Sequence, residues 1–190
     1  MSGSRGETSD GPPAGPSGIV LPETPLSRAL DGLVGRIGEW SSWIWAILMM
    51  LIVWQVVQRY VFSRGSIALE EAQWHLYAIG LLLSLSFAEV RERHVRIDVL
   101  AEHWPRRRRL RVELFGLLVF ALPFALFVVI YAVPYVVTSW SLNERSSAPD
   151  GLPYRYLLKS FLVLAFALLA LAAISRLSRV VAALRRSDPA

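Results

Sequence analysis

The chain of 190 residues has no cysteine and only one lysine, and these two scarcities exclude several chemistries. Without cysteine there is no disulfide, no thiolate nucleophile and no cysteine-ligated zinc or iron–sulfur centre. The lysine, Lys159, lies beside an apolar run, where it is expected to anchor the chain at a membrane interface rather than form a Schiff base. The sequence also lacks the Gly-x-Ser-x-Gly, phosphate-loop and Gly-x-Gly-x-x-Gly patterns. We therefore predict no enzyme activity and no catalytic residue.

Histidine is scarce as well, because the chain has only His75, His94 and His103. Haem ligation by two imidazoles needs paired histidines that face each other within a helix bundle, and only His75 lies at an apolar run. His94 and His103 have neither the spacing nor the carboxylate neighbours of a helical zinc site. We predict no metal and no cofactor, and a haem-binding membrane redox protein remains only an alternative.

Apolar residues are abundant, at 54% of the chain with a mean hydropathy of +0.44. Such a composition predicts an integral membrane protein. Because the backbone groups of a span must be hydrogen-bonded within the protein, and a helix bonds them within one segment, we predict an all-α fold. The net charge of +5 comes with arginines that lie beside apolar runs. This pattern favours anionic lipids, and not nucleic acid, as the partner of the basic residues.

Four apolar runs are each about long enough to cross a bilayer. They cover residues 40–62, 70–88, 114–137 and 156–174. Together with flanking segments they define a predicted membrane domain at residues 26–186. Residues 1–25, rich in Ser, Gly and Pro, are expected to form a disordered tail, and residues 187–190 a short second tail. No cleaved signal peptide is predicted, since the first long apolar run begins only near Trp40.

Arginines are unevenly divided between the links, which predicts the orientation of the chain. Residues 89–113 hold eight arginines and five acids, whereas residues 138–156 hold two of each. By the positive-inside rule the first link and both termini are cytoplasmic, in a multi-pass protein of the bacterial inner membrane. The arginines expected to contact anionic lipid are Arg106, Arg107, Arg108, Arg109 and Arg111.

Amphipathic segments flank the spans. Thr24 and Pro25 are a plausible N-cap and first helical position, and apolar residues recur at helical spacing from Leu26 to Ile37. This helix is expected either to lie along the membrane surface or to pack on neighbouring protein, with about equal weight. After residue 174 the chain returns to a basic amphipathic pattern with Arg176, Arg179, Arg185 and Arg186. The fold expected is four transmembrane helices with amphipathic surface helices on the cytoplasmic side.

Charged residues at the ends of the first two spans suggest a clamp. Arg59 closes the first span, and Glu70 with Glu71 opens the second, so a hairpin brings them to the same membrane face. A clamp between the spans or to a partner subunit is one interpretation, because ionisable groups at membrane edges are costly unless partnered. The other is that all three side chains reach water at the interface. Gln55 and Gln58 share a side with Arg59 and are expected to face protein.

Several motifs in order resemble one known family. Gln-Arg-Tyr at 58–60 closes the first span, Glu-Glu opens the second, and Arg93-His-Val-Arg-Ile-Asp-Val-Leu100 follows it. Together with Gly80 and the 151–160 element that begins Gly-Leu-Pro-Tyr, they resemble the small membrane subunit of tripartite ATP-independent periplasmic (TRAP) transporters, the DctQ-like family. The resemblance covers residues 41–176. Ala172 is a departure, since many relatives carry glutamine near that position.

The resemblance implies a role in secondary active transport. A periplasmic binding protein would deliver an organic acid, and a large permease subunit would carry it using the sodium gradient. The small subunit would brace the large one without binding substrate. The expected contacts are a cytoplasmic motif of Arg93, His94, Arg96 and Asp98, and an outer link that includes Gly151, Pro153, Tyr154 and Lys159. A stand-alone small membrane transporter is a further alternative, although a translocation path would need polar groups at mid-bilayer.

Overall fold

The computed structural model describes residues 21–90 and 104–186, which form helices joined by short links and contain no strand. The elements are α1 (Pro25–Ser41), α2 (Trp43–Val61), α3 (Ile67–Val90), α4 (Arg106–Gly116), the π-helical segment η1 (Leu117–Ala121), α5 (Leu122–Ser141) and α6 (Arg155–Arg186). The prediction of an all-α fold is confirmed for this part of the chain.

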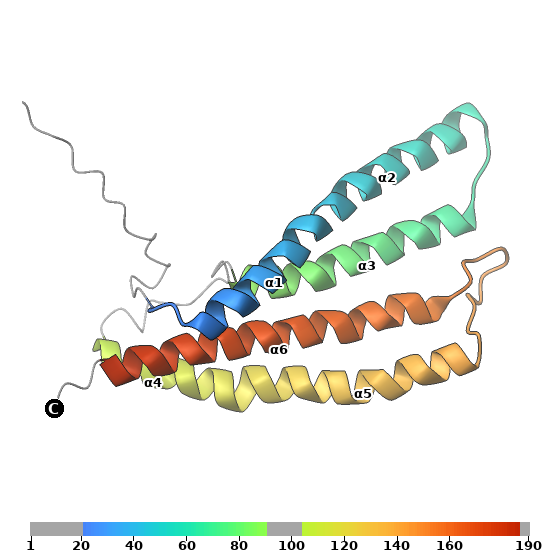
Figure 1. The fold of residues 1–190 in the computed structure, drawn as a ribbon. Coiled ribbons are helices and arrows are strands. Elements are labelled where there is room, and N and C mark those ends of the chain that lie inside the picture. Colours follow the sequence, from blue (N-terminus) through green and yellow to red (C-terminus); the bar gives the residue numbers. More distant parts are fainter. Residues whose placement is uncertain (1–20, 91–103, 187–190) are drawn as a thin grey trace, which may run out of the picture.

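Helix α6 is the element that the others surround. It packs against α5 along one side and against α3 and α1 along another, while α2 packs mainly on α3 (Figure 1). The bundle has two distinct ends. The start of α1, helix α4 and the end of α6 lie at one, which we call the basic end, and the α2–α3 turn and the α5–α6 link (residues 142–154) lie at the other, which we call the link end.

Helix α1 begins where the sequence predicts. The Thr24 hydroxyl accepts a hydrogen bond from the Ser27 backbone N–H at 3.1 Å, and the Ser27 hydroxyl oxygen accepts one from the Thr24 N–H at 3.0 Å. Pro25 follows in the first turn, where a missing N–H costs nothing. The N-cap prediction is confirmed. Val34 of this helix lies in a buried cluster with Leu83 and Leu168, so α1 packs on the protein.

Close helix approach explains several buried small residues. A Cβ atom built on Gly38 of α1 would come within 2.7 Å of the Phe87 Cβ of α3, so only glycine fits there. On the next interface the buried Ser86 hydroxyl donates to the Ala165 carbonyl of α6 at 2.8 Å. These contacts fix α3 between α1 and α6 at short distances.

Proline shapes the third apolar run. Pro123 removes a backbone N–H and clashes with the carbonyl four residues earlier, which disfavours regular α-helix at that point. The structure has the π-helical turn η1 immediately before it, whereas α5 continues through Pro134. The departure from regular α-helix therefore lies next to Pro123, and α5 accommodates Pro134.

Three helical stretches among the described residues are long and apolar enough to cross a membrane: Pro25–Val61, Arg106–Ser141 and Arg155–Arg186. Helix α3 does not reach the same apolar level, because Gln73, His75 and Glu89 interrupt its apolar residues. It runs alongside the other helices for its whole length (Figure 1). A crossing by α3, and hence the count of four spans, remains a prediction.

Some predicted features lie outside the described residues. These are residues 1–20 of the N-terminal tail, the C-terminal residues 187–190, and the predicted cytoplasmic motif of Arg93, His94, Arg96 and Asp98. Within the described residues, Leu21 packs against a cluster that contains Leu110 and Val180.

Candidate functional sites at the two ends of the bundle

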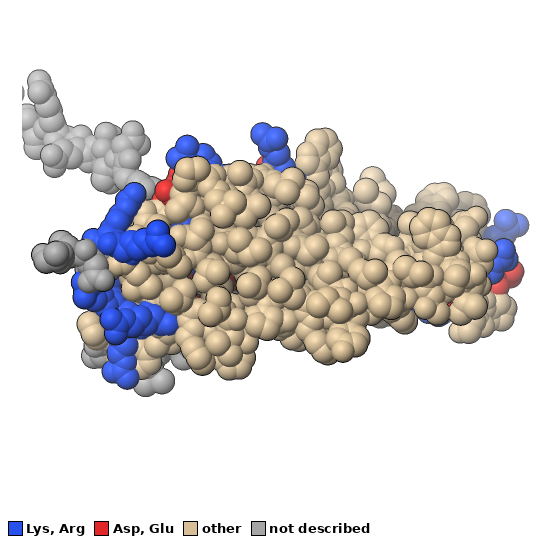
Figure 2. All heavy atoms as spheres, turned by 60° about the horizontal axis from the view of Figure 1, so that its bottom comes forward, with Lys and Arg blue, Asp and Glu red and all other residues tan. Residues whose placement is uncertain are grey.

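Charged side chains gather at the two ends of the molecule. Figure 2 shows lysine and arginine concentrated at one end, a smaller charged group at the other, and a long band of other residues between them. Much of that band is exposed apolar surface, including Met50, Trp54, Phe120 and Ile130, each more than half exposed. The distribution is the one expected of a protein whose middle faces hydrocarbon.

At the link end, the carboxylate of Glu71 holds the α5–α6 link against α3. It accepts a hydrogen bond from the Ser146 hydroxyl and another from the Leu152 backbone N–H at 2.7 Å. Gly151 lies so close that an added Cβ atom would be 2.6 Å from the Ser146 oxygen and 3.0 Å from a Glu71 oxygen. The predicted outer-link residue Gly151 is thus needed for a close approach of backbone to carboxylate.

A second carboxylate, Glu144, ties the link to α6. It forms an ion pair with Lys159 and accepts a hydrogen bond from the Ser139 hydroxyl at 2.7 Å. The Lys159 ammonium also lies 3.8 Å from the centre of the Tyr135 ring. The hydrogen bond from Lys159, followed by that from Ser139, holds the pKa of Glu144 below its usual value. The single lysine therefore has a structural partner inside the chain.

The backbone of the link is as constrained as its side chains. Asn143, Asp150 and Tyr154 adopt positive φ angles of 45°, 59° and 66°. Asparagine and aspartate tolerate this conformation better than other side chains, whereas an aromatic residue such as Tyr154 rarely adopts it. Backbone hydrogen bonds from Ser146 N–H to the Leu152 carbonyl and from residue 155 to residue 144 close the loop. The link is a shaped, internally bonded surface.

The predicted partners of the clamp are distributed differently from the sequence-based expectation. Glu71 binds the α5–α6 link, and among the described residues no ion pair joins Arg59 to Glu70 or Glu71. Arg59 and Glu70 are both exposed. Gln55 does face protein, because its side-chain oxygen accepts a hydrogen bond from Gln73 of α3. The Arg59 clamp stays a prediction that concerns a partner subunit.

At the basic end, a buried arginine that sequence reasoning assigned to an amphipathic tail lies inside the bundle. The Arg176 side chain is 4% exposed, and its Nε lies 2.6 Å from a Glu113 oxygen of α4 and 4.0 Å from a Glu89 oxygen of α3. A buried guanidinium needs such acidic partners, because an unpaired charge out of water is very costly. Helices α3, α4 and α6 therefore meet at one ion cluster.

A neighbouring contact adds α1 to this junction. The Ser175 hydroxyl donates to an Asp31 oxygen at 2.6 Å, and Arg179 approaches the other oxygen of Asp31 at 3.8 Å. We call Asp31, Glu89, Glu113, Ser175, Arg176 and Arg179 the basic-end cluster. A signal for it was present in the sequence, since Ala172, Ala173 and Ser175 are small residues at which a neighbouring helix can approach α6 closely.

The arginines predicted to contact lipid begin helix α4. Arg106, Arg107, Arg108 and Arg111 are exposed, Arg109 is half-buried, and the Arg108 guanidinium lies 4.4 Å from the centre of the Trp104 ring. These arginines lie at the surface of the basic end, and their contact with lipid remains a prediction.

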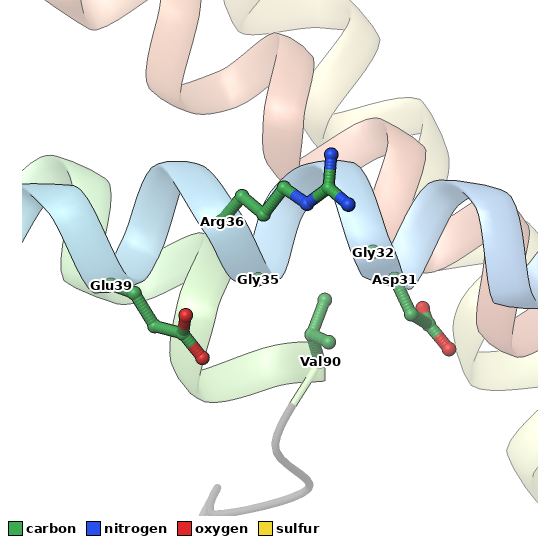
Figure 3. Close-up of a pocket in the computed structure, with 6 residues that line it drawn as sticks. All are labelled: Asp31, Gly32, Gly35, Arg36, Glu39 and Val90. Atoms are coloured by element: carbon green, nitrogen blue, oxygen red, sulfur yellow. The ribbon is translucent and has the colours of Figure 1, made fainter.

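A hollow at this end is lined mostly by acidic and small residues. Asp31, Gly32, Gly35, Arg36 and Glu39 of α1 form its wall together with Val90, the last residue of α3. Figure 3 shows the Asp31 and Glu39 carboxylates on either side of Val90. Two carboxylates against one guanidinium make it unsuited to an anion.

Three long apolar helical stretches and a large exposed apolar surface define the class of the molecule: an α-helical membrane protein. A comparison with family models then identifies its family. Residues 48–183 match the model described as "Tripartite ATP-independent periplasmic transporters, DctQ component", and the chain belongs to this family. No curated protein and no solved structure matches the chain.

Membership gives the chain a place in an assembly. It is the small membrane subunit of a TRAP transporter, a transporter component and not a member of an enzyme family. The other components of such a transporter are the large permease subunit and the periplasmic binding protein. The resemblance inferred from the sequence motifs is confirmed.

Proposed function

We propose that this subunit braces the large permease subunit during sodium-driven uptake of an organic acid that a periplasmic binding protein delivers. In this proposal α2, α3, the α4–α5 stretch and α6 cross the bacterial inner membrane, so the chain passes four times. The basic end and both termini face the cytoplasm, and the α5–α6 link faces the periplasm.

The bracing role is supported by the location of the polar contacts within the chain. The basic-end cluster ties α1, α3, α4 and α6 together, and the Glu71 and Glu144 contacts tie α3, α6 and the link at the opposite end. Between them the α5 segment has no ionisable group apart from tyrosine, and α2 has only Arg59, near its end. A chain fixed at both ends and apolar between them is suited to holding helices in place, and not to passing a polar solute.

The α5–α6 link is the surface we assign to the periplasmic binding protein. Its conformation is fixed by two carboxylates before any partner arrives, so docking requires little ordering. Pro153 and Tyr154 are exposed there, whereas Gly151 and Lys159 are occupied by contacts within the chain. Pro153 and Tyr154 are therefore the residues of the predicted set that would touch the partner directly.

Arg59 and Glu70 are the residues we assign to the large subunit. They are exposed at the link end, on adjacent helices whose apolar faces are also exposed. Charged groups at a membrane edge gain most when a partner supplies the opposite charge. This retains the predicted clamp as a contact between subunits.

Co-purification tests the proposal. The tagged chain, co-expressed with the neighbouring gene for a large membrane protein, should retain that protein through detergent extraction. Arg59→Ala should reduce the retained fraction more than Arg64→Ala, an exposed arginine of the α2–α3 turn. Failure of the unmodified chain to retain the large subunit would refute the bracing role.

The orientation is open to a clean labelling test, because the natural chain has no cysteine. Ser147→Cys in the link should react with a membrane-impermeant maleimide in intact cells, and Ser187→Cys should react only after the membrane is opened. The reverse pattern, or labelling of both from outside, would contradict four crossings with a cytoplasmic basic end.

A further inference from the structure

We propose that a groove between the start of α1 and the last turns of α6 is a binding site for one anionic phospholipid. The groove, of about 440 Å³, is lined by Thr24 and Leu26 on one side and by a stripe of α6 on the other. That stripe consists of Ile174, Leu177, Ser178, Val181, Ala182 and Arg185. The inference rests on the proposed membrane placement, but not on the bracing role.

The groove has the polarity of a phospholipid. The α6 residues that line it recur at intervals of three and four, so they form one continuous face of the helix. Apart from Ser178, their side chains are apolar from Ile174 to Ala182, and the stripe ends at the exposed Arg185. An acyl chain fits the apolar part, and a phosphate fits the cationic end.

The stripe begins where the predicted span of α6 ends. From residue 174 to residue 185 an α-helix rises roughly 16 Å at 1.5 Å per residue. Since the predicted span of α6 covers residues 156–174, the stripe runs from the edge of the hydrocarbon core through the headgroup region. Arg185, in the last turn of α6, is the cationic end of the stripe and belongs to the basic end of the bundle.

The polar groups in the wall leave the cation available. The Ser178 hydroxyl donates to the Ser175 carbonyl at 2.7 Å and lies 2.9 Å from the Thr24 hydroxyl, so both hydroxyls hold α1 against α6. No acidic residue lines the groove, and within residues 21–90 and 104–186 no ion pair is formed by Arg185. The hollow of Figure 3, with its two carboxylates, lacks this feature.

Native mass spectrometry of the delipidated full chain would test the site, with dioleoyl phosphatidylglycerol as probe and dioleoyl phosphatidylcholine as neutral reference. One cation near the headgroup predicts about fivefold tighter binding of the anionic lipid. Arg185→Gln should remove this preference, while Arg186→Gln, which does not line the groove, should keep it. Ala182→Phe, which fills the apolar part, should weaken binding of both lipids.

Each result decides the proposal. Equal binding of the two lipids, or equal loss in Arg185→Gln and Arg186→Gln, would overturn it, because charge alone without a site would then explain the binding. Loss of the lipid from the chain when the large subunit is bound would also overturn it, since the groove would then be a subunit contact. Unchanged helical circular dichroism must accompany every variant. A failure of the large subunit to co-purify would leave the lipid result unaffected.

Discussion

Replacing Arg176 by methionine should destabilise the bundle strongly. Its side chain is 4% exposed, and Glu113 and Glu89, at 17% and 19%, face it at 2.6 and 4.0 Å. Without the guanidinium, two partly buried carboxylates both lose the buried cation that faces them. Breaking a buried pair in this way costs about 3–5 kcal/mol, and the partial exposure of the acids favours the lower value.

The expected loss is measurable from the fluorescence of the seven tryptophans during thermal unfolding in detergent. A loss of about 3 kcal/mol corresponds to roughly 6–12 °C in Tm for a chain of this size. Arg186→Met, an exposed arginine on the same helix, is the matched control and should change the free energy of unfolding by no more than about 0.5 kcal/mol.

A double variant separates charge pairing from packing. Arg176→Met combined with Glu113→Leu should be more stable than Arg176→Met alone, because one of the two facing carboxylates is then removed. If the two substitutions destabilise additively, or if Arg176→Met behaves like Arg186→Met, the basic-end cluster does not hold the helices together as described.

Three further predictions concern the links and interfaces. Hydrogen bonds lower the pKa of Glu144 in the folded state below its ordinary 4.5, so its contribution to stability is present above pH 4.5 and is lost as the pH falls through the folded-state pKa. Between pH 7 and 3 the Tm should therefore fall less in Glu144→Gln than in the natural chain. Equal falls in Tm would refute the assignment. Gly151→Ala should cost about 1–3 kcal/mol and speed maleimide labelling of Ser147→Cys, since the added methyl displaces the link; unchanged labelling would contradict this. Gly38→Ala should lower the free energy of unfolding by about 1–3 kcal/mol, whereas Gly32→Ala, with open space around it, should leave it unchanged or raise it. A larger loss in Gly32→Ala than in Gly38→Ala would disprove the close packing at Gly38.

Helical periodicity and the N-cap signal were sufficient to predict several features of the fold. The Thr24 cap, the positions of the long apolar helices and the α2 side on which Gln55 faces protein all follow from local spacing. The predicted spans fall within or close to the observed helices, although α6 extends to Arg186, well beyond the predicted span. The C-terminal part of α6 was predicted as a surface helix, because the sequence pattern of charge does not show which arginines are buried.

The sequence alone did not predict which polar residues contact one another. Glu71 meets Leu152, which is 81 residues away, and Arg176 meets Glu113 across 63 residues, so no local pattern links them. A hairpin argument favoured Arg59 for Glu71 because it is near in sequence, whereas the packing of α3 on α6 brings the link closer. Tertiary packing decides such pairings, and it is set by all the helices together.

Reconstitution into liposomes with an imposed sodium gradient tests the central claim most directly. With the large permease subunit and the loaded binding protein present, vesicles that contain this chain should accumulate the organic acid, and vesicles that contain this chain alone should accumulate none. Uptake by this chain without its partners would contradict the account, as would full uptake by the large subunit and binding protein when this chain is left out.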